Sequence, residues 1–370
     1  KAPFIDGSTV NDMPFAAVIR ALTGRPAHRE VTRRLVFVDP DPVMSAERGE
    51  GVPGMFRTML AAMVEIPANE PVREELERLD RLNGRIRILR RVVDLARPQV
   101  AEQVEQIIGT WTTRWPTRRK MSRWRDQANE TAMHNSGFAF ESYFRLKILN
   151  VVKHLEELLT DLGGGGASDI DEDLIEARVS AWALLGLDAL RSDANGARAR
   201  DIEFLRSFDV DYRVRRLRFV IRRLNELYRV PASDGAERKS EDLDRIKILL
   251  YAHLESVRKR WKRDFYGPEI IGSAVALGLK GTSPAGVGEV MRRIGERMAM
   301  TRLDEEVDEV FVTAAAEYLD REARHELITA YIGFSFFDVL SYPMVQWEDL
   351  GELDEILIHR ISPEDARAFQ

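Results

Sequence analysis

Apolar residues recur every three or four positions along most of this chain, which is the pattern of amphipathic helices. The first long stripe runs from Val72 to Ala96, and the Arg97-Pro98 pair is expected to break or kink this helix before the pattern resumes at Val100. Further stripes predict helices over residues 143–159, 214–228, 243–261 and 307–319. No fixed repeat period relates the stripes, so the helices are expected to pack as a bundle and not as a regular solenoid.

The first 42 residues follow a different pattern, which is typical of α/β structure. Phe4-Ile5 predicts the end of a strand, and residues 14–22 predict a helix with proline in its first turn. Residues 35–38 form a continuous apolar run that Asp39-Pro40 ends, as in a strand buried on both faces of a sheet. Two strands joined by a helix predict one unit of a parallel sheet.

A late apolar segment, residues 355–361, predicts one more strand. A single late strand usually joins an existing sheet, so we expect the two ends of the chain to meet. The predicted fold is therefore mainly α, with a helical bundle-like domain over residues 67–370 attached to a short α/β part over residues 1–66. Because two strands do not make a stable sheet, the rest of this sheet is expected upstream of Lys1.

Glycine and proline mark the predicted boundaries between helices. The run Gly163 to Gly166 predicts a flexible link, and Ser168 with Asp171 three residues later predicts the cap of the next helix. Gly267-Pro268 predicts another break.

Composition narrows the class of protein. The chain has 370 residues, of which 44% are hydrophobic and 31% charged, so it can bury cores and remain soluble. Its formal charge of -6 argues against a general nucleic-acid binder. The absence of cysteine excludes disulfides, thiolate catalysis and cysteine-bound zinc, and fits a cytoplasmic protein. No apolar run approaches the ~18 residues that a membrane span needs.

One polar turn is the main candidate for chemistry. Asp6-Gly7 follows the first predicted strand directly, and α/β sheets collect their functional groups at the carboxyl ends of strands. Glycine allows a sharp turn after the carboxylate, which could then face a cleft. The simpler interpretation is an ordinary polar turn between a strand and a helix.

Five segments resemble one known family. Asp6-Gly7-Ser8, residues 11–15 and residues 34–40 look like the end of a patatin-like phospholipase domain, in which an Asp-Gly motif precedes a proline-containing loop and a strand that closes in proline. Residues 333–339 and 360–366 are similar to patatin-related bacterial proteins that carry a long helical extension. The α/β part would then be the C-terminal piece of a patatin-type catalytic domain.

The resemblance implies a serine lipid acyl hydrolase with a Ser-Asp dyad and no cofactor. Asp6 would be the carboxylate that acts as base for the serine hydroxyl. The Gly-x-Ser-x-Gly turn and the glycine-rich oxyanion loop of such enzymes are absent from these 370 residues. We therefore expect the nucleophile upstream, a lipid or acyl ester as substrate, and no activity from this chain alone. In one departure, Asn11-Asp12 inverts the family's Asp-Asn order.

Other polar groups favour structural interpretations. The acidic run from Asp304 to Glu309 is expected to be a solvated helix face, and His253 a core or boundary residue. Glu322 and His325 have the Glu-x-x-His spacing of di-metal sites, but the sequence holds no second pair. Residues 169–173 resemble the start of a calcium loop without its required glycine and glutamate. No metal site is predicted.

Two segments rich in arginine and tryptophan, residues 111–125 and 258–263, could contact an anionic membrane surface. The simpler interpretation is that their cations pair with the 61 acidic residues. The alternative to the hydrolase is therefore a non-catalytic helical module for protein interaction or membrane docking. The sequence predicts no oligomeric state.

Overall fold

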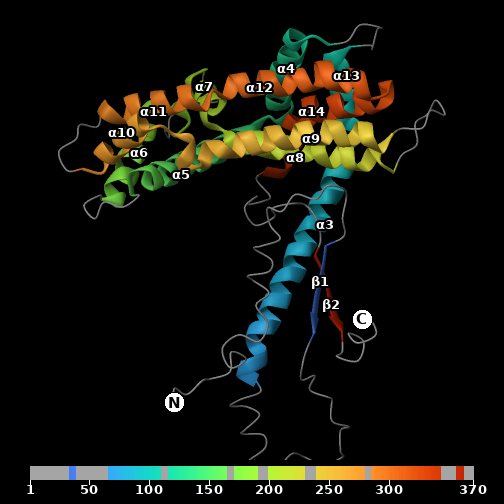
Figure 1. Ribbon diagram of the computed structural model, residues 1–370, viewed down its shortest axis with the longest axis horizontal. Coiled ribbons are helices and arrows are strands. Elements are labelled where there is room, and N and C mark those ends of the chain that lie inside the picture. The colour runs from blue at the N-terminus through green and yellow to red at the C-terminus, as the bar shows by residue number, and fades with distance from the viewer. Residues whose placement is uncertain are drawn as a thin grey trace, which may run out of the picture. The chain divides into compact units, whose positions relative to one another are not determined.

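The computed structural model describes residues 33–38, 66–109, 116–164, 171–190, 199–229, 239–279, 285–342 and 356–361 (Figure 1). The fold is mainly α, as the hydrophobic stripes predict. The chain divides into two compact units. The first combines Lys1–Leu95 with Val345–Gln370, and the second, which we call the helical unit, extends from Ala96 to Met344.

The first unit contains a parallel pair of strands. β1 (Arg33–Val38) pairs with β2 (Ile356–Ile361), in a register that places Arg33 opposite Ile356 and Val38 opposite Ile361. These are the strands expected at 35–38 and 355–361, and their pairing brings together segments from the two ends of the chain. The strand at Phe4-Ile5 and the helix at 14–22 lie outside the described residues.

Helix α3 (Ile66–Ile108) is continuous, so of the break or kink expected at Arg97-Pro98, a break is wrong and a kink stays a prediction. Proline removes one backbone donor from a helix interior, and the remaining hydrogen bonds and the packing hold the helix together. The apolar stripe is confirmed, because Leu79, Ile86 and Leu89 are buried on one face. The boundary between the two units falls within this helix, after Leu95.

The helical unit consists of helices that pack in pairs (Figure 1). Helix α8 lies against α9, α5 against α6 and α10, and α14 against both α8 and α4. The helices after α3 have these bounds: α4 (Arg118–Ser136), α5 (Phe138–Gly164), α6 (Glu172–Gly186), η3 (Asp188–Leu190), α7 (Ala199–Phe208), α8 (Val210–Leu227), α9 (Ser240–Arg258), η4 (Lys259–Trp261), η5 (Arg263–Phe265), α10 (Pro268–Leu277), α11 (Ala285–Met298), α12 (Met300–Glu309), the π-helical turn η6 (Val310–Ala314), α13 (Ala315–Tyr318) and α14 (Arg321–Ser341).

Helix α14 is the central element of this unit. Its residues from Ala330 to Val339 are all buried, as expected of a helix that neighbours cover on every side. At Gly333, a Cβ atom would lie 2.9 Å from Cγ1 of Val100 and 3.1 Å from Cγ2 of Val104. The missing side chain of Gly333 thus allows the C-terminal part of α3 to pack closely on α14.

The stripe expected over residues 143–159 is wrong in part. Leu146 and Leu149 are 37% and 53% exposed, whereas their neighbours Phe144, Ile148 and Val151 are buried. Steps of three and four residues fit two adjacent faces of a helix, and contacts with α6 and α10 select the buried face of α5.

The flexible link predicted from Gly163 to Gly166 is wrong for its first two residues, because helix α5 continues to Gly164. Gly163 packs tightly: a Cβ there would lie 3.0 Å from Cδ1 of Ile175 on α6. The cap of α6 is Asp171, whose carboxylate accepts the N–H of Leu174 at 3.1 Å, while Ser168 lies outside the described residues. Gly267-Pro268 begins α10 as expected.

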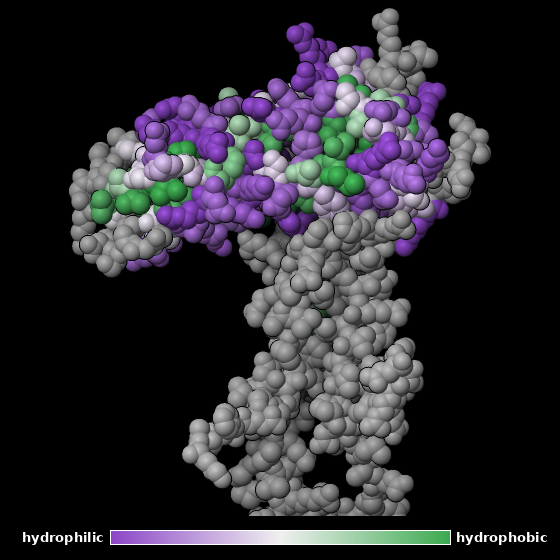
Figure 2. All heavy atoms as spheres, viewed as in Figure 1, coloured by the Kyte–Doolittle hydropathy of each residue, from purple (hydrophilic) through white to green (hydrophobic). Residues whose placement is uncertain are grey.

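The visible face of the helical unit is mostly hydrophilic, with apolar patches between the helices (Figure 2). This distribution follows from amphipathic helices whose apolar stripes turn inward. None of the described helices has an apolar stretch long enough to cross a membrane.

Candidate functional site: a charged cavity in the helical unit

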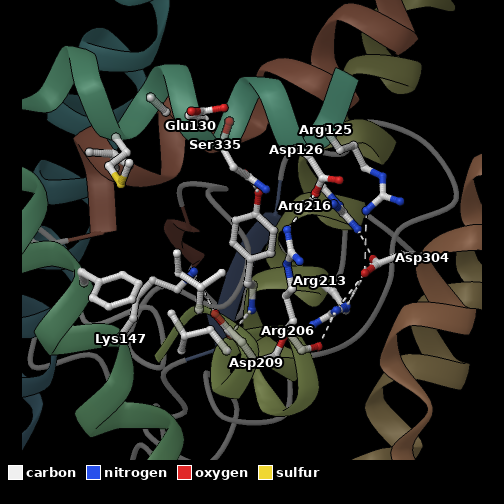
Figure 3. A pocket seen from close by; sticks show the side chains of 18 of the residues that line it. Arg125, Asp126, Glu130, Lys147, Arg206, Asp209, Arg213, Arg216, Asp304 and Ser335 are labelled. Carbon is white, nitrogen blue, oxygen red and sulfur yellow. Dashed lines mark hydrogen bonds and ion pairs between the residues drawn. The ribbon is translucent and has the colours of Figure 1, made fainter. Parts of the chain in front are cut away.

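A cavity of about 530 Å³ lies within the helical unit (Figure 3). Six helices supply its walls: α4, α5, α7, α8, α12 and α14. This size is typical of sites for small organic ligands. Arg125, Arg213, Arg216 and Asp304 gather at one side of the cavity, and Lys147 lies at the other (Figure 3).

Asp304 on α12 is the centre of the charged side. Arg213 on α8 donates to it from Nε at 3.2 and 3.1 Å and from Nη2 at 2.7 Å. Arg216, one turn further along α8, donates from Nη2 at 2.5 Å, and Nη1 of Arg125 lies 3.7 Å from the carboxylate. Burial alone would raise the pKa of Asp304, but the three guanidinium groups outweigh burial and hold this pKa well below its usual value.

Asp308 lies one turn after Asp304 and is fully buried. Arg125 on α4 binds both of its oxygens, from Nε at 3.0 Å and from Nη2 at 2.8 Å, and the hydroxyl of Tyr331 donates to it at 3.0 Å. Burial raises the pKa of Asp308, and Arg125 only partly offsets this effect. The two aspartates therefore join α12 to α4, α8 and α14.

A second buried group surrounds Asp338 on α14. Arg215 donates to its two oxygens at 2.8 and 3.0 Å, and the hydroxyl of Tyr143 donates at 2.8 Å. Nζ of Lys147 lies 3.8 Å from Asp338 and 2.8 Å from Asp209. Burial would raise the pKa of Asp209, but Lys147 and Arg215 lower it below its usual value.

The group around Asp338 and the group around Asp304 differ in net charge. Lys147 and Arg215 oppose Asp209 and Asp338, which leaves no net charge. In the group around Asp304, which we call the arginine cluster, three arginines oppose two aspartates: Arg125, Arg213, Arg216, Asp304 and Asp308. Among the described residues, the arginine cluster thus carries one positive charge in excess. An uncompensated buried charge is costly, so this side of the cavity favours an anion.

Aromatic rings hold the cations in place. The guanidinium of Arg216 lies 4.6 Å from the ring centre of Tyr331, and Nζ of Lys147 lies 4.1 Å from that of Tyr212. Such contacts stabilise a cation whose water has been removed. Burial raises the pKa of Tyr212 to about 12, so its hydroxyl keeps its proton at neutral pH.

Three polar atoms of the cavity wall have no hydrogen-bond partner among the described residues: Oδ2 of Asp209, Nε of Arg216 and Oγ of Ser335. Oδ2 of Asp209 still has an ion-pair partner, Nζ of Lys147 at 2.8 Å, which leaves the donors of Arg216 and Ser335. Both side chains are buried. Ser335 follows Tyr331 by four residues on α14 and therefore lies one turn beyond the ring that Arg216 contacts. Buried polar atoms are rarely left unsatisfied, so a ligand or a water molecule inside the cavity is expected to accept from these two donors.

The rim of the cavity is polar and exposed. Arg206 on α7 donates to Asp126 on α4 at 3.2 Å, and both side chains are more than half exposed. Glu130 and Glu203 are also exposed at the rim. Exposed ion pairs contribute little to stability, so the rim is a weaker part of the site than the buried arginine cluster.

Sequence reasoning missed this site. The acidic run 304–309 was expected to face solvent, but Asp304 and Asp308 are buried. The available signal was their position beside the apolar residues Leu303 and Val307, which form the buried stripe of α12. A carboxylate on a buried stripe needs a cationic partner, and α8 supplies arginines at the matching positions.

Asp6, the residue predicted to be catalytic, lies outside the described residues, as do residues 169–170 of the calcium-like segment. Glu322 and His325 lie in the first turns of α14, and the described part of the chain contains no group of three or more residues that could hold a metal ion. His253 lies at the boundary of the core, where burial lowers its pKa despite the nearby Glu306.

The basic segment 258–263 makes contacts within the helical unit. Nε of Arg260 donates to the carbonyl of Met298 at 3.2 Å, Nε1 of Trp261 donates to Asp211 at 3.2 Å, and Nη1 of Arg263 donates to the carbonyl of Leu162 at 2.9 Å. These contacts favour a structural role for the segment. In the other basic segment, residues 110–115 lie outside the described part.

Comparisons with family models, curated proteins and solved structures give no match to this chain.

Proposed function

We propose that this chain is the C-terminal part of a serine lipid acyl hydrolase of the patatin-like kind, with Asp6 as the carboxylate of a Ser-Asp dyad. The nucleophilic serine would come from sequence upstream of Lys1, because this chain contains no Gly-x-Ser-x-Gly turn. Asp6 would accept the proton of the serine hydroxyl as the serine attacks the ester carbonyl.

The parallel pairing of β1 with β2 is the observation that supports this proposal most. Two of the segments that resemble the family, residues 34–40 and 360–366, overlap these strands. The strands lie side by side, with Phe37 opposite Arg360 and Val38 opposite Ile361. Parallel strands end at the same edge of a sheet, which is where an α/β enzyme places its catalytic groups.

Labelling with a fluorophosphonate probe tests this proposal. A form extended upstream to include the serine turn should be labelled and should hydrolyse acyl esters, and Asp6→Asn should reduce the rate by about 10²- to 10⁴-fold. The matched control Asp41→Asn changes a carboxylate just beyond β1 and should leave the rate unchanged. Labelling of the 370-residue chain alone, or full activity of Asp6→Asn, would contradict the proposal.

A second candidate function belongs to another class: a non-catalytic helical module for binding. The observation that favours it is the charged cavity, whose lining residues all belong to the helical unit. The two functions have different requirements, so separate experiments distinguish them. The hydrolase requires the extended form and Asp6, whereas ligand binding by the cavity requires neither.

A further inference from the structure

The cavity has two chemically different ends. Seven apolar residues line it: Ala132, Met133, Phe140, Phe144, Ile202, Leu205 and Val339. Met133 follows Arg125 by eight residues on α4, which corresponds to about 12 Å along the helix axis. The part of the apolar wall at Met133 is therefore separated from Arg125 by about the length of a medium acyl chain, whereas Val339 lies only one turn beyond Ser335 on α14.

The charged end suits one negative charge. The arginine cluster has one positive charge in excess among the described residues. Nε, Nη1 and Nη2 of Arg213 all donate to Asp304 or to backbone carbonyls, so Arg213 holds the wall of the cavity together and is not assigned to the ligand. Arg216 keeps an unpaired Nε, and Ser335 an unpaired hydroxyl, for an incoming ligand.

We propose that this cavity binds a fatty acid, with its carboxylate against Arg216, Ser335 and Arg125 and its acyl chain over the apolar wall. A carboxylate brings the single negative charge that the arginine cluster lacks, and charge-assisted hydrogen bonds are the strongest that a protein forms with such a group. The acyl chain gains free energy by leaving water for the apolar wall.

The rim disfavours a more highly charged ligand. Asp126, Glu130 and Glu203 place three carboxylates there, against the single cation of Arg206. Phosphate and its monoesters carry up to two negative charges and would meet stronger repulsion at this rim. They would also leave the apolar wall exposed to water, so a monocarboxylate with a chain fits both ends better.

This inference stands on the contacts of the helical unit and does not rest on the proposed hydrolase activity. Isothermal titration calorimetry on the 370-residue chain tests it, with decanoate below its micellar range as the probe. Decanol supplies the chain without the charge, acetate the charge without the chain, and inorganic phosphate a different anion. Decanoate should bind at least about ten-fold more tightly than each of the three.

Ser335 is the informative position for substitution. Its hydroxyl has no hydrogen-bond partner among the described residues, so Ser335→Ala should fold normally, unlike changes to Arg216, which also pairs with Asp304. Ser335→Ala should weaken decanoate binding by about five-fold, which corresponds to one hydrogen bond. The matched control is Ser341→Ala on the same helix, whose hydroxyl donates to the carbonyl of Phe337 and which does not line the cavity. Its decanoate affinity should equal that of the wild type.

The apolar end is tested by Met133→Trp, whose larger side chain should obstruct this end of the cavity and weaken decanoate binding by at least about five-fold, with circular dichroism confirming the fold. Failure of the wild-type chain to bind decanoate would overturn the proposal. Equal affinity for decanoate and decanol would show that the arginine cluster does not recognise the carboxylate, which would contradict the proposal. Unchanged binding of decanoate by Ser335→Ala and Met133→Trp would show that the ligand lies outside this cavity. None of these outcomes depends on ester hydrolysis.

Discussion

Arg213 on α8 binds both carboxylate oxygens of Asp304 on α12, at distances between 2.7 and 3.2 Å, and both side chains are buried. Arg213 also donates to the backbone carbonyls of Arg206 and Asp209 at 2.8 and 2.9 Å. The pair therefore joins α12 to the junction between α7 and α8. It fixes the charged wall of the cavity, because Asp304 in turn orients Arg216.

Asp304→Asn should destabilise the helical unit by about 3–5 kcal/mol, because it leaves buried guanidinium groups without their counter-charge. Urea unfolding followed by circular dichroism measures this change. The matched control is Glu305→Gln, which removes the neighbouring exposed carboxylate and should change stability by no more than about 0.5 kcal/mol. Similar effects of the two substitutions would show that the arginine cluster does not stabilise the fold.

The contribution of Asp304 should disappear in acid. Its folded pKa is lowered, so the unfolded chain binds the proton more readily, and stability is lost as the pH falls below the unfolded value of about 3.9. The difference in unfolding free energy between the wild type and Asp304→Asn should therefore be largest at pH 6 and should shrink steadily towards pH 3. Urea titrations at several pH values check this, and a difference that grew in acid would contradict the assignment. Asp209 has a lowered pKa as well, so the wild type should lose further stability over the same range.

Gly333→Ala should destabilise the helical unit by about 1–3 kcal/mol, because the new methyl group would overlap Val100 of α3. The matched control Gly272→Ala places a methyl group in α10 where no atom lies within 4 Å. It should leave stability unchanged or raise it by up to about 1 kcal/mol, through the better helix propensity of alanine. Thermal unfolding measures both variants. Combining Val100→Ala with Gly333→Ala should cost less than the sum of the two single changes, and simple additivity would argue against this contact.

Periodicity located the helices α3, α5, α8 and α9 and the segment from α12 to α13, because the apolar residues of an amphipathic helix recur on its buried face. It did not predict α4, α7, α11 or the central helix α14. Helix α9 is an example: Leu243, Ile246, Leu250 and Val257 belong to the predicted stripe and are buried. Periodicity could not choose between adjacent faces of α5, where Leu146 is exposed and Phe144 is buried. That choice depends on the helices packed against α5, which no local pattern specifies.

Local rules for glycine and proline were less reliable where tertiary packing competed with them. Pro98 does not end α3, and Gly163 belongs to α5, where a Cβ atom would lie 3.0 Å from Cδ1 of Ile175 on α6. The charged cavity was missed for the same reason. The cost of burying Asp304 becomes acceptable only when Arg213, Arg216 and Arg125 converge on it from two other helices.

The sequence by itself determined that the chain is mainly α and that apolar strands lie near residues 35–38 and 355–361. These features are local, since each depends on residues within a few positions of one another. Only the tertiary structure decided that the two strands pair in parallel. It also decided that Asp304 and Asp308, in an acidic run expected to face solvent, form ion pairs with buried arginines. Such contacts join residues far apart in the chain, and their free energy exists only once the helices have packed.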